Sequence, residues 1–267
     1  MLDLKDKVAI VTGSGRGNGR GVAIALAEHG AAVMVCDLNE ENAKNVAEEI
    51  NAAGGRAIST KVDVTDPESV EAMVKLTTDT FGPVTTLINN AGIIYWKDFF
   101  SQTLEEFRRE VRVNLDSVFI CTQIVAKQMI ENGIKGSIVN FSSEAVSSAF
   151  PEGIGYSASK GGVQAITLGL AGYLAPQGIR VNSIAPGPTP TGMNTFMHEV
   201  ADKIAETIPL GRVGDPYKDH GRMCVVLASD EYSGWITGEN ILIDGGKVKI
   251  PYIYKKEENP EFESKVN

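Results

Sequence analysis

Residues Val8–Gly19 read VAIVTGSGRGNG, an apolar run that ends in a glycine-rich turn. The turn, Thr12-Gly13-Ser14-Gly15-Arg16-Gly17-Asn18-Gly19, leads directly into the amphipathic segment Gly19–His29. Glycines allow a tight turn and a close approach of the backbone to a pyrophosphate. The helix that follows offers free N–H groups and a positive dipole end to the anion. The stretch therefore predicts a nucleotide-binding strand–turn–helix unit, although Asn18 at the sixth position departs from a strict GxGxxG.

Short apolar runs alternate with helix-length segments along nearly the whole chain. The runs are rich in Val and Ile, as in strands buried on both faces: Val8–Thr12, Ala32–Asp37, Ala57–Asp63, Thr86–Asn89, Ser137–Phe141, Arg180–Ala185 and Asn240–Asp244. The helical segments Gly19–His29 and Glu41–Ala53 are each followed by a glycine, a common helix stop. This alternation predicts an α/β fold, a Rossmann-like doubly wound parallel sheet in a single domain.

We assign residues 1–249 to this Rossmann-like nucleotide-binding domain and 250–267 to a C-terminal tail. Residues 187–209 contain several prolines and polar residues and are expected to form a mobile lid. In the tail, the apolar patch Pro251–Tyr254 is expected to dock on this subunit or a neighbour, and the charged end to be solvated.

The composition narrows the function and the location of the protein. A net charge of -9 on 267 residues argues against a nucleic-acid or anionic-membrane partner, although a local basic patch is compatible with it. Cys36, Cys121 and Cys224 have no CxxC spacing and are expected to be buried, reduced thiols. The start of the chain does not resemble a signal peptide, and no apolar run approaches the roughly 20 residues that span a bilayer. We therefore expect a cytoplasmic protein.

Asp37 closes the second predicted strand, where a carboxylate can accept hydrogen bonds from both hydroxyls of an adenosine ribose. The same charge opposes the 2′-phosphate of NADP. At a separation of ~4 Å and an effective dielectric constant near 20, two unit charges repel by roughly 4 kcal/mol before screening. Arg16, in the turn, is able to compensate in part. We weigh Asp37 above Arg16, because Asp37 is fixed to the strand end that meets the ribose, and predict NAD as the cofactor.

Seven ordered motifs make the chain resemble the short-chain dehydrogenase/reductase family from about Leu4 to Gly246. They are the Thr12–Gly19 turn, Asp63-Val64, Asn89-Asn90-Ala91-Gly92, Asn114, Ser143, Tyr156-Ser157-Ala158-Ser159-Lys160 and Pro186-Gly187. The resemblance implies a homodimer or homotetramer formed through two long helices, around 103–131 and 157–175. It also implies a set of cofactor contacts: Gly13, Arg16, Gly17, Asn18, Gly19, Asp37, Leu38, Asp63, Val64, Asn90, Ala91, Gly92, Tyr156, Lys160, Pro186, Gly187, Thr189 and Thr191.

Tyr156 and Lys160 are four residues apart and therefore share one face of a helix. A free tyrosine, with a pKa near 10, is a poor base at neutral pH, and lowering that pKa by about three units requires roughly 4 kcal/mol. A neighbouring ammonium and a cationic nicotinamide supply such a preference for the phenolate. We assign Tyr156 as the general base in alcohol oxidation and the general acid in ketone reduction, and Lys160 as the group that lowers its pKa and binds the nicotinamide ribose.

Two further residues complete the predicted catalytic set. Ser143 would hold the substrate oxygen and stabilise developing charge. Ser142 is the alternative, and the spacing of the family selects Ser143. The resemblance gives Asn114, in a predicted helix, a water-mediated proton relay to Lys160.

Several residues depart from the pattern of the family. Asn18 replaces the usual apolar residue and would lie beneath the nicotinamide. We expect Glu144 to point to solvent; the alternatives are that it recognises a polyol or an amine, or disfavours an anionic substrate. The segment Lys218-Asp219-His220-Gly221-Arg222 is unusually polar, and we expect His220 at the surface. His29, His198 and His220 show no metal-ligand spacing, so no metal site is predicted.

These observations predict an NAD-dependent oxidoreductase that interconverts a secondary alcohol or polyol and a ketone. The residues expected around the substrate are mixed in polarity: Tyr95, Trp96, Glu144, Phe150, Ile154 and Met193. One alternative is an NADPH-dependent 3-oxoacyl thioester reductase, which requires Arg16 to outweigh Asp37. Another is a protein that binds the nucleotide without turnover.

Overall fold

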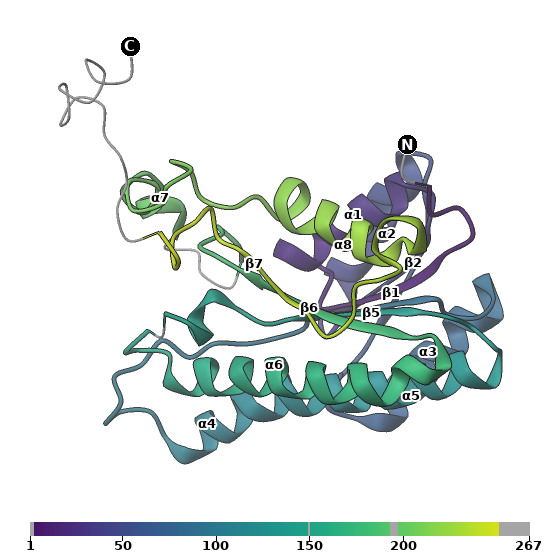
Figure 1. The fold of residues 1–267 in the computed structure, drawn as a ribbon, viewed down its shortest axis with the longest axis horizontal. Helices are drawn as coiled ribbons and strands as arrows, with labels where there is room; N and C mark the ends of the chain where they lie inside the picture. The colour runs from purple at the N-terminus through teal and green to yellow at the C-terminus, as the bar shows by residue number, and fades with distance from the viewer. Residues whose placement is uncertain (1–2, 149, 193–196, 251–267) are drawn as a thin grey trace, which may run out of the picture.

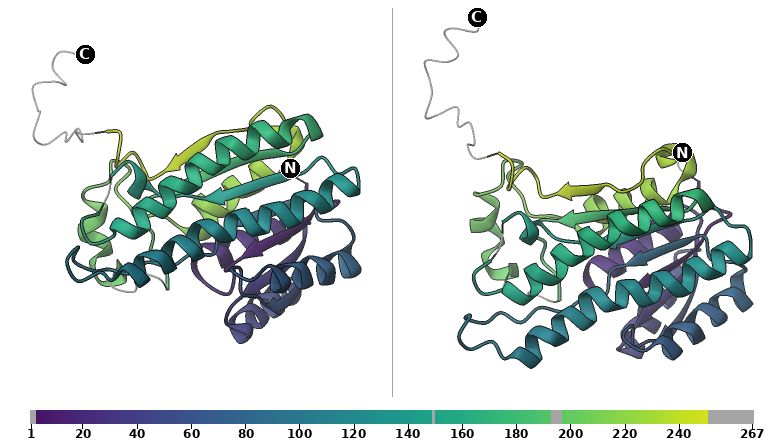
Figure 2. Two further views of the ribbon diagram at one scale, coloured as in Figure 1. Left: turned by 90° about the horizontal axis from the view of Figure 1, so that it is seen from below. Right: turned by 60° about the horizontal axis from the view of Figure 1, so that its bottom comes forward.

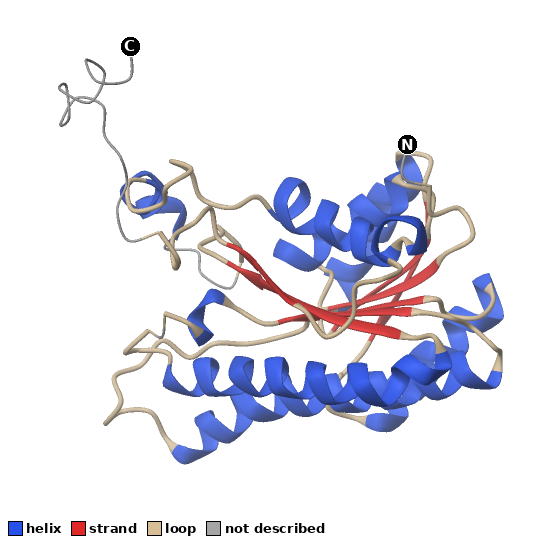
Figure 3. Cartoon of the chain, viewed as in Figure 1, coloured by secondary structure: helices blue, strands red, loops and turns tan. Residues whose placement is uncertain are grey.

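The computed structural model describes residues 3–148, 150–192 and 197–250. They form a single seven-stranded sheet, parallel throughout, in the order β3-β2-β1-β4-β5-β6-β7 (Figure 3). Its strands are β1 (Val8–Thr12), β2 (Ala32–Asp37), β3 (Arg56–Lys61), β4 (Thr86–Asn89), β5 (Ser137–Phe141), β6 (Arg180–Pro186) and β7 (Asn240–Ile243). The predicted α/β, doubly wound fold is confirmed. The order reverses between β1 and β4, and in such sheets ligands bind outside the carboxyl ends of the strands at that point.

Helices cover both faces of the sheet (Figure 1). One face carries α1 (Gly17–Glu28), α2 (Glu40–Ala52) and α8 (Arg222–Ala228), and the other α3 (Pro67–Phe81), α5 (Ser117–Glu131) and α6 (Ile154–Leu174). Each layer buries its own apolar cluster against the strands. Two such layers need both faces of the central strands to be apolar, which explains their continuous Val and Ile runs.

The remaining helices lie beside the ends of the strands. They are α4 (Leu104–Val111), η1 (Arg112–Asp116), η2 (Glu144–Val146), η3 (Ala175–Gln177), α7 (Met197–Ala205), η4 (Pro216–Gly221) and α9 (Asp230–Ser233). Helix α4 continues through η1 into α5, and this long rod lies beside α6 (Figure 2). η1 and η4 are π-helical turns, which often occur at functional sites.

The predicted strand boundaries agree with the structure to within two residues. Four strands match without change, whereas β3 ends at Lys61 rather than Asp63. There the chain leaves the sheet to form the cap of α3, since the side chain of Asp66 accepts a hydrogen bond from the Glu68 amide. Pro251–Tyr254 and Met193 lie outside the described residues.

All three cysteines are buried and unpaired, as predicted. One expectation about η4 is wrong: His220 is fully buried rather than at the surface. The π-turn packs on α1 so closely that a Cβ atom on Gly21 would lie 2.5 Å from the carbonyl carbon of Pro216. This contact carries His220 into the interior.

No helix in residues 3–148, 150–192 and 197–250 combines the length and the hydropathy that a membrane crossing requires.

Candidate active site

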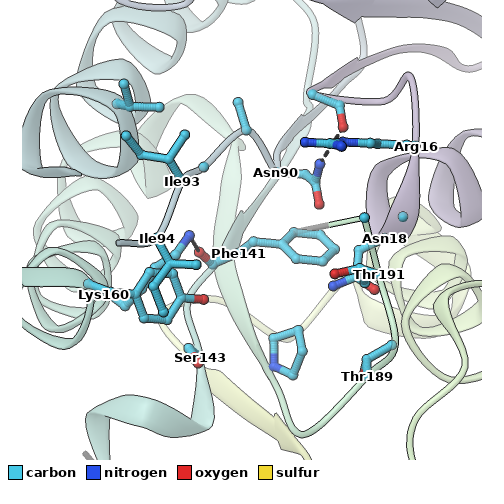
Figure 4. A pocket seen from close by; sticks show the side chains of 18 of the residues that line it. Arg16, Asn18, Asn90, Ile93, Ile94, Phe141, Ser143, Lys160, Thr189 and Thr191 are labelled. Carbon is cyan, nitrogen blue, oxygen red and sulfur yellow. Dashed lines mark hydrogen bonds between the residues drawn. The ribbon is translucent and has the colours of Figure 1, made fainter. Parts of the chain in front are cut away.

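A cavity of about 960 Å³ opens at the carboxyl ends of the strands. Figure 4 shows Arg16, Asn18 and Asn90 at one end of it, and Lys160 and Ser143 at the other. Of the predicted cofactor and catalytic residues, all but Gly19 and Asn114 line this cavity. The fold thus brings together side chains from both halves of the chain in one pocket.

Two glycines of the turn have backbone conformations that side chains rarely adopt. Gly13 has φ of +62° and Gly17 of +55°. A Cβ atom on Gly13 would lie 2.8 Å from the Cα atom of Ala91, so the turn packs directly against the chain that follows β4. Both the conformation and the contact require glycine there.

The first turn of α1 presents its backbone N–H groups to the pocket. Its N-cap, Arg16, makes no capping hydrogen bond with its side chain, and the first turn contains no acidic residue. An uncapped helix start with the positive end of its dipole beside a cavity binds an anion. The turn therefore fits the pyrophosphate of a dinucleotide.

Asn90 fixes the glycine-rich turn to the end of β4. Its side-chain Nδ2 donates to the carbonyl oxygens of Thr12 and Gly13, each at 2.9 Å, and its backbone N–H donates to Thr12 Oγ1 at 3.0 Å. These bonds hold the turn at one distance from the central strands. The side-chain amide of Asn90 is thus bound to the turn, and its implied contact with the cofactor stays a prediction.

Asp37 lies beside the turn, at the end of β2. Its carboxylate accepts hydrogen bonds from the backbone N–H groups of Gly15 and Asn39, both at 3.0 Å. Arg16 extends toward Gly192 instead, since a Cβ atom on Gly192 would lie 2.9 Å from Arg16 Cδ. The Asp37 carboxylate is thus fixed by backbone N–H groups, whereas the Arg16 side chain lies along Gly192.

Asp63 and Val64 form the wall of the pocket beyond Asp37, with the exposed side chain of Leu38. The carboxylate of Asp63 accepts hydrogen bonds from the hydroxyl of Thr65 at 2.7 Å and from its backbone N–H at 2.9 Å. These bonds lower the pKa of Asp63, the side-chain bond having the larger effect. Asp63 therefore stays ionised at this edge.

Lys160 is buried in α6, and its ammonium donates a 2.6 Å hydrogen bond to the carbonyl oxygen of Phe141 at the end of β5. The Nζ atom lies 5.7 Å from the centre of the Tyr156 ring. Burial lowers the pKa of Lys160 to about 8. Burial also raises the pKa of Tyr156; a hydrogen bond with Ser143 lowers it, and the charges of Glu144 and Glu110 raise it further. Among the protein's own groups burial has the largest effect on the pKa of Tyr156 and raises it. The expected lowering by Lys160 together with a cationic nicotinamide stays a prediction.

Ser143 and Ser142 are both buried but have different partners. Ser143 Oγ accepts a hydrogen bond from the Ala145 N–H at 3.1 Å and faces the cavity beside Tyr156. Ser142 Oγ donates to the carbonyl oxygen of Lys160 at 3.2 Å, which turns it toward the backbone of α6. Of the two serines, Ser143 is therefore the one whose hydroxyl lies at the phenol.

Asn114 lies in the π-turn η1 and is completely buried. Its Nδ2 donates to the carbonyl oxygen of Ile93 and to Ser159 Oγ, both at 2.9 Å, and its Oδ1 accepts from the Ile93 N–H at 2.7 Å. Gly92 separates it from Lys160: a Cβ atom there would lie 3.1 Å from Asn114 Oδ1 and 3.5 Å from Lys160 Nζ. Both amide protons of Asn114 are already donated, so only its Oδ1 atom can form a further hydrogen bond on the side of Lys160.

The end of β6 and the segment that follows it reach the cavity through Pro186, Gly187, Thr189 and Thr191. This segment contacts the glycine-rich turn, since a Cβ atom on Gly17 would lie 3.2 Å from Thr191 Cβ. Lys203, Ile204 and Thr207, which sequence analysis did not identify, also line the pocket.

Of the predicted substrate residues, Trp96, Phe150 and Glu144 line the pocket, and the first two pack with ring centres 5.6 Å apart. Tyr95 and Ile154 are not part of its wall. The expectation that Glu144 points to solvent is wrong, because the side chain is buried and forms an ion pair with Lys247 at 3.0 Å. Lys247 was not identified from the sequence, since it lies 103 residues away from its partner.

Asn18 is paired with His220, a contact that sequence analysis also missed. The Nδ1 atom of His220 lies 3.1 Å from Asn18 Oδ1. Burial lowers the pKa of His220 to about 4, so the ring is neutral at neutral pH. A neutral ring that donates from Nδ1 leaves the amide N–H₂ of Asn18 for the pocket.

Known proteins share both the sequence and the shape of this chain. The model of the family described as Enoyl-(Acyl carrier protein) reductase matches residues 13–247. The chain belongs to the short-chain dehydrogenase/reductase family. A short-chain dehydrogenase/reductase of Mycobacterium marinum has a similar structure, with a TM-score of 0.88 and 34% identity over 93% of this chain and 98% of the other.

Two relatives within the short-chain dehydrogenase/reductase family have named activities. The 2,5-dichloro-2,5-cyclohexadiene-1,4-diol dehydrogenase of Sphingobium indicum is 38% identical over 91% of this chain and 96% of the relative. The 3-oxoacyl-(acyl-carrier-protein) reductase of Synechocystis is 37% identical over 93% and 99%. As a short-chain dehydrogenase/reductase, this chain is an NAD(P)-dependent oxidoreductase that acts on CH–OH groups.

Proposed function

We propose that this enzyme interconverts a secondary alcohol or polyol and the corresponding ketone with NAD, and that Tyr156 transfers the proton. The observation that supports this most directly is that Tyr156, Ser143 and Lys160 lie in the same cavity as the glycine-rich turn and Asp37. The diol relative uses a substrate of the proposed class.

The protein residues have distinct roles in the proposed reaction. In alcohol oxidation Ser143 holds the hydroxyl oxygen of the substrate while Tyr156 accepts its proton. A bound nicotinamide would supply the acceptor for the hydride from the carbinol carbon, and its positive charge would oppose the upward shift that burial imposes on the pKa of Tyr156. Lys160 adds its charge and binds the nicotinamide ribose. Ketone reduction reverses each step.

Asn114 is proposed to complete the route of the proton to solvent. The small volume above Gly92, between Asn114 and Lys160, suits a bridging water, because a substituent there would contact both side chains. Asn114 Oδ1 would accept a hydrogen bond from that water, and Lys160 would exchange protons with it.

The choice of NAD rests on the fixed carboxylate of Asp37. Two backbone N–H groups hold it at the strand end, whereas Arg16 lies along Gly192. A 2′-phosphate beside Asp37 would therefore meet a negative charge. The remaining contacts proposed for the cofactor are the pocket residues described above, from Leu38 and Val64 to Thr189 and Thr191.

Initial rates at the absorbance band of reduced nicotinamide test this proposal on a panel of secondary alcohols, diols, ketones and one 3-oxoacyl thioester. We expect kcat/KM with NADH to exceed that with NADPH by at least about a hundredfold, given a repulsion of roughly 4 kcal/mol before screening. Asp37→Asn, which keeps an oxygen for Gly15, should reduce this ratio at least about tenfold. Asp79→Asn on the surface of α3 is the matched control.

The alternatives give different results in the same assay. A preference for NADPH together with the thioester would establish the acyl thioester reductase instead. Binding of NAD without turnover of any panel member would favour a non-catalytic nucleotide-binding protein.

We further propose a homodimer or homotetramer that associates through the long rod of α4 and α5 and through α6. Phe119 and Leu168, on these helices, are 50% and 63% exposed, and large apolar side chains on one surface favour association. Light scattering of the purified protein measures the number of subunits, and a monomer would contradict this proposal.

A further inference from the structure

Glu144 and Lys247 form a buried ion pair in the wall of the pocket that the proposed reaction does not use. The Glu144 side chain is 3% exposed and that of Lys247 is 23% exposed. Glu144 comes directly after Ser143, so its charge lies at the reacting end of the cavity, where it raises the pKa of Tyr156. The two residues are contributed by separate strand ends, those of β5 and β7.

The loop that carries Lys247 is held in a defined position. The carboxylate of Asp244 accepts hydrogen bonds from the N–H groups of Gly246 at 2.9 Å and Val248 at 2.7 Å, on both sides of Lys247. The ammonium lies 3.0 Å from Glu144 Oε1 and 6.0 Å from the centre of the Phe150 ring. The site is thus built by specific backbone contacts and does not depend on a flexible surface lysine.

The pair does not satisfy its own hydrogen-bonding capacity. Glu144 Oε2 is buried, and no described residue donates to it. A buried carboxylate oxygen without a donor is unfavourable, and a buried ion pair is in general weak support for stability. A residue pair of this kind is better explained by a ligand that supplies the missing donor.

The charges of the pair restrict what that ligand group is. A carboxylate or phosphate near Lys247 would face the negative charge of Glu144, and an ammonium near Glu144 would face Lys247. A neutral hydroxyl group donates to Glu144 Oε2 and accepts from Lys247 Nζ, so it satisfies both residues. Trp96 and Phe150, which line the same pocket, offer apolar surface for the carbon skeleton of such a ligand.

We propose that Glu144 and Lys247 form a subsite for a second hydroxyl group of the substrate, which makes the preferred substrate an uncharged diol or polyol. This inference rests on the proposed alcohol and ketone chemistry at Tyr156. It adds the class of substrate, and with it two residues that determine specificity.

The test compares ligands that differ only in the second hydroxyl group. Cyclohexanol is measured beside the cis and trans cyclohexane-1,2-, 1,3- and 1,4-diols, with 4-aminocyclohexanol and 4-hydroxycyclohexanecarboxylate as charged analogues. Both kcat/KM and the Kd for the complex of the full chain with NAD are determined, so that binding is read without turnover. We expect at least one diol to exceed cyclohexanol by roughly tenfold or more, and both charged analogues to bind more weakly than that diol.

The variants are designed to remove the subsite while keeping the fold. Glu144→Leu should reduce the ratio of diol to cyclohexanol to about one, and Glu144→Gln, which keeps hydrogen-bonding capacity, should reduce it less. The ratio is used because a change in the pKa of Tyr156 affects both ligands equally. The double variant Glu144→Leu/Lys247→Met leaves neither partner of the ion pair unpaired. It tests the subsite in the same way if the single variant fails to fold. Lys75→Met/Asp79→Leu, an exposed pair on α3, is the control.

Each outcome is decisive for the subsite. Equal treatment of diols and cyclohexanol by the wild-type protein, an unchanged ratio in the variants, or tightest binding of either charged analogue would overturn the inference. Preferential binding of a diol that is lost in the variants supports it even if no ligand is oxidised. In that case the proposed reaction fails while the hydroxyl subsite stands.

Discussion

At the glycine-rich end of the pocket the groups that face a ligand are mainly backbone amides, fixed by Asn90 and Asp37. At the Ser143 end they are side chains from α6, from the end of β5 and from the loop after β7. The first end depends on conformation and close contact, with φ of +62° at Gly13. The second depends on charges in the pocket wall, those of the buried Lys160 and Glu144 and of the partly exposed Lys247.

This difference has consequences for how each end responds to substitution. Backbone amides cannot be removed by changing a side chain. Nucleotide binding at the glycine-rich end of the pocket (the nucleotide end) should therefore tolerate most substitutions, except those at the glycines that shape the turn and at Asn90 and Asp37, which fix it. At the Ser143 end (the substrate end), the loss of a single hydroxyl group or charge should change activity, because these groups take part in the chemistry directly. Variants in each region, with matched controls, measure that contrast.

The largest effect is expected for Tyr156→Phe, which removes only the phenolic oxygen. Because the proton then has no donor or acceptor at the substrate, kcat should fall by about 10³-fold. The Kd for NAD should change less than about threefold, since the nucleotide end is untouched. Tyr173→Phe, on the same helix and 76% exposed, is the control. Substantial kcat in Tyr156→Phe would show that another group moves the proton.

His220→Asn is expected to change the pH dependence of stability. The pKa of His220 in the folded protein is about 4, below its usual value of 6.5, so the unfolded chain binds more protons between these values. The free energy of unfolding therefore falls as the pH drops from 6.5 toward 4, by up to about 3 kcal/mol from this residue. Urea unfolding at pH 7.5 and pH 4.5 should show that His220→Asn loses most of this extra sensitivity.

The control for that measurement is His29→Asn, at the end of α1, which should keep the acid sensitivity of the wild-type protein. If the free energy of unfolding of His220→Asn depended on pH as strongly as that of the wild-type protein, the buried ring would not be the group that titrates. Binding of NAD at pH 7.5 should change only a few fold, because the Asn amide also donates a hydrogen bond to Asn18.

Gly13→Ala tests the close contact of the glycine-rich turn at the nucleotide end of the pocket. The alanine Cβ would lie 2.8 Å from the backbone Cα atom of Ala91, so the turn or the strand end must move. Gly133→Ala is matched in φ, at +67°, but nothing lies within 4 Å of its Cβ. Both variants should lose roughly 1–2 kcal/mol of stability from the left-handed conformation. Only Gly13→Ala should in addition weaken the Kd for NAD, by about tenfold or more, and equal Kd values would contradict the close-contact argument.

The nucleotide end is also the part that the sequence allows one to predict. The strands were found because residues buried on both faces must be apolar, and the Gly13–Gly19 turn because a positive φ and a 2.8 Å contact leave few alternatives to glycine. The ribose-binding role of Asp37 was predicted from its position at the end of a strand. Each of these inferences needs only neighbouring residues, as does the pairing of Tyr156 with Lys160. Ser143, by contrast, was selected by the resemblance to the short-chain dehydrogenase/reductase family.

The substrate end was harder to predict because its partners are distant in the chain. The burial of Glu144 depends on Lys247, which β7 brings to it, and nothing beside Glu144 in sequence indicates that lysine. His220 is buried because Gly21 permits close packing of η4 on α1. The sequence did contain a signal for the burial of His220. Asn18 is polar at a position where the family has an apolar residue, and His220 lies in a polar segment that was expected at the surface. In the structure these two side chains pair with each other.

The smallest expected effect is a shift in the pH profile of Glu144→Gln. The negative charge of Glu144 raises the pKa of Tyr156, so its removal favours the phenolate and lowers that pKa. In alcohol oxidation, where kcat/KM rises as Tyr156 loses its proton, the midpoint should move to lower pH by about half a unit to one unit. In ketone reduction, where the protonated phenol is needed, the fall in kcat/KM should begin at correspondingly lower pH. Glu152→Gln, exposed on the loop before α6, should leave both midpoints in place. A midpoint that moves upward in Glu144→Gln would mean that the carboxylate acts on Lys160 or on the substrate rather than on the phenol, and the substrate end would then no longer be governed by the charge beside Ser143.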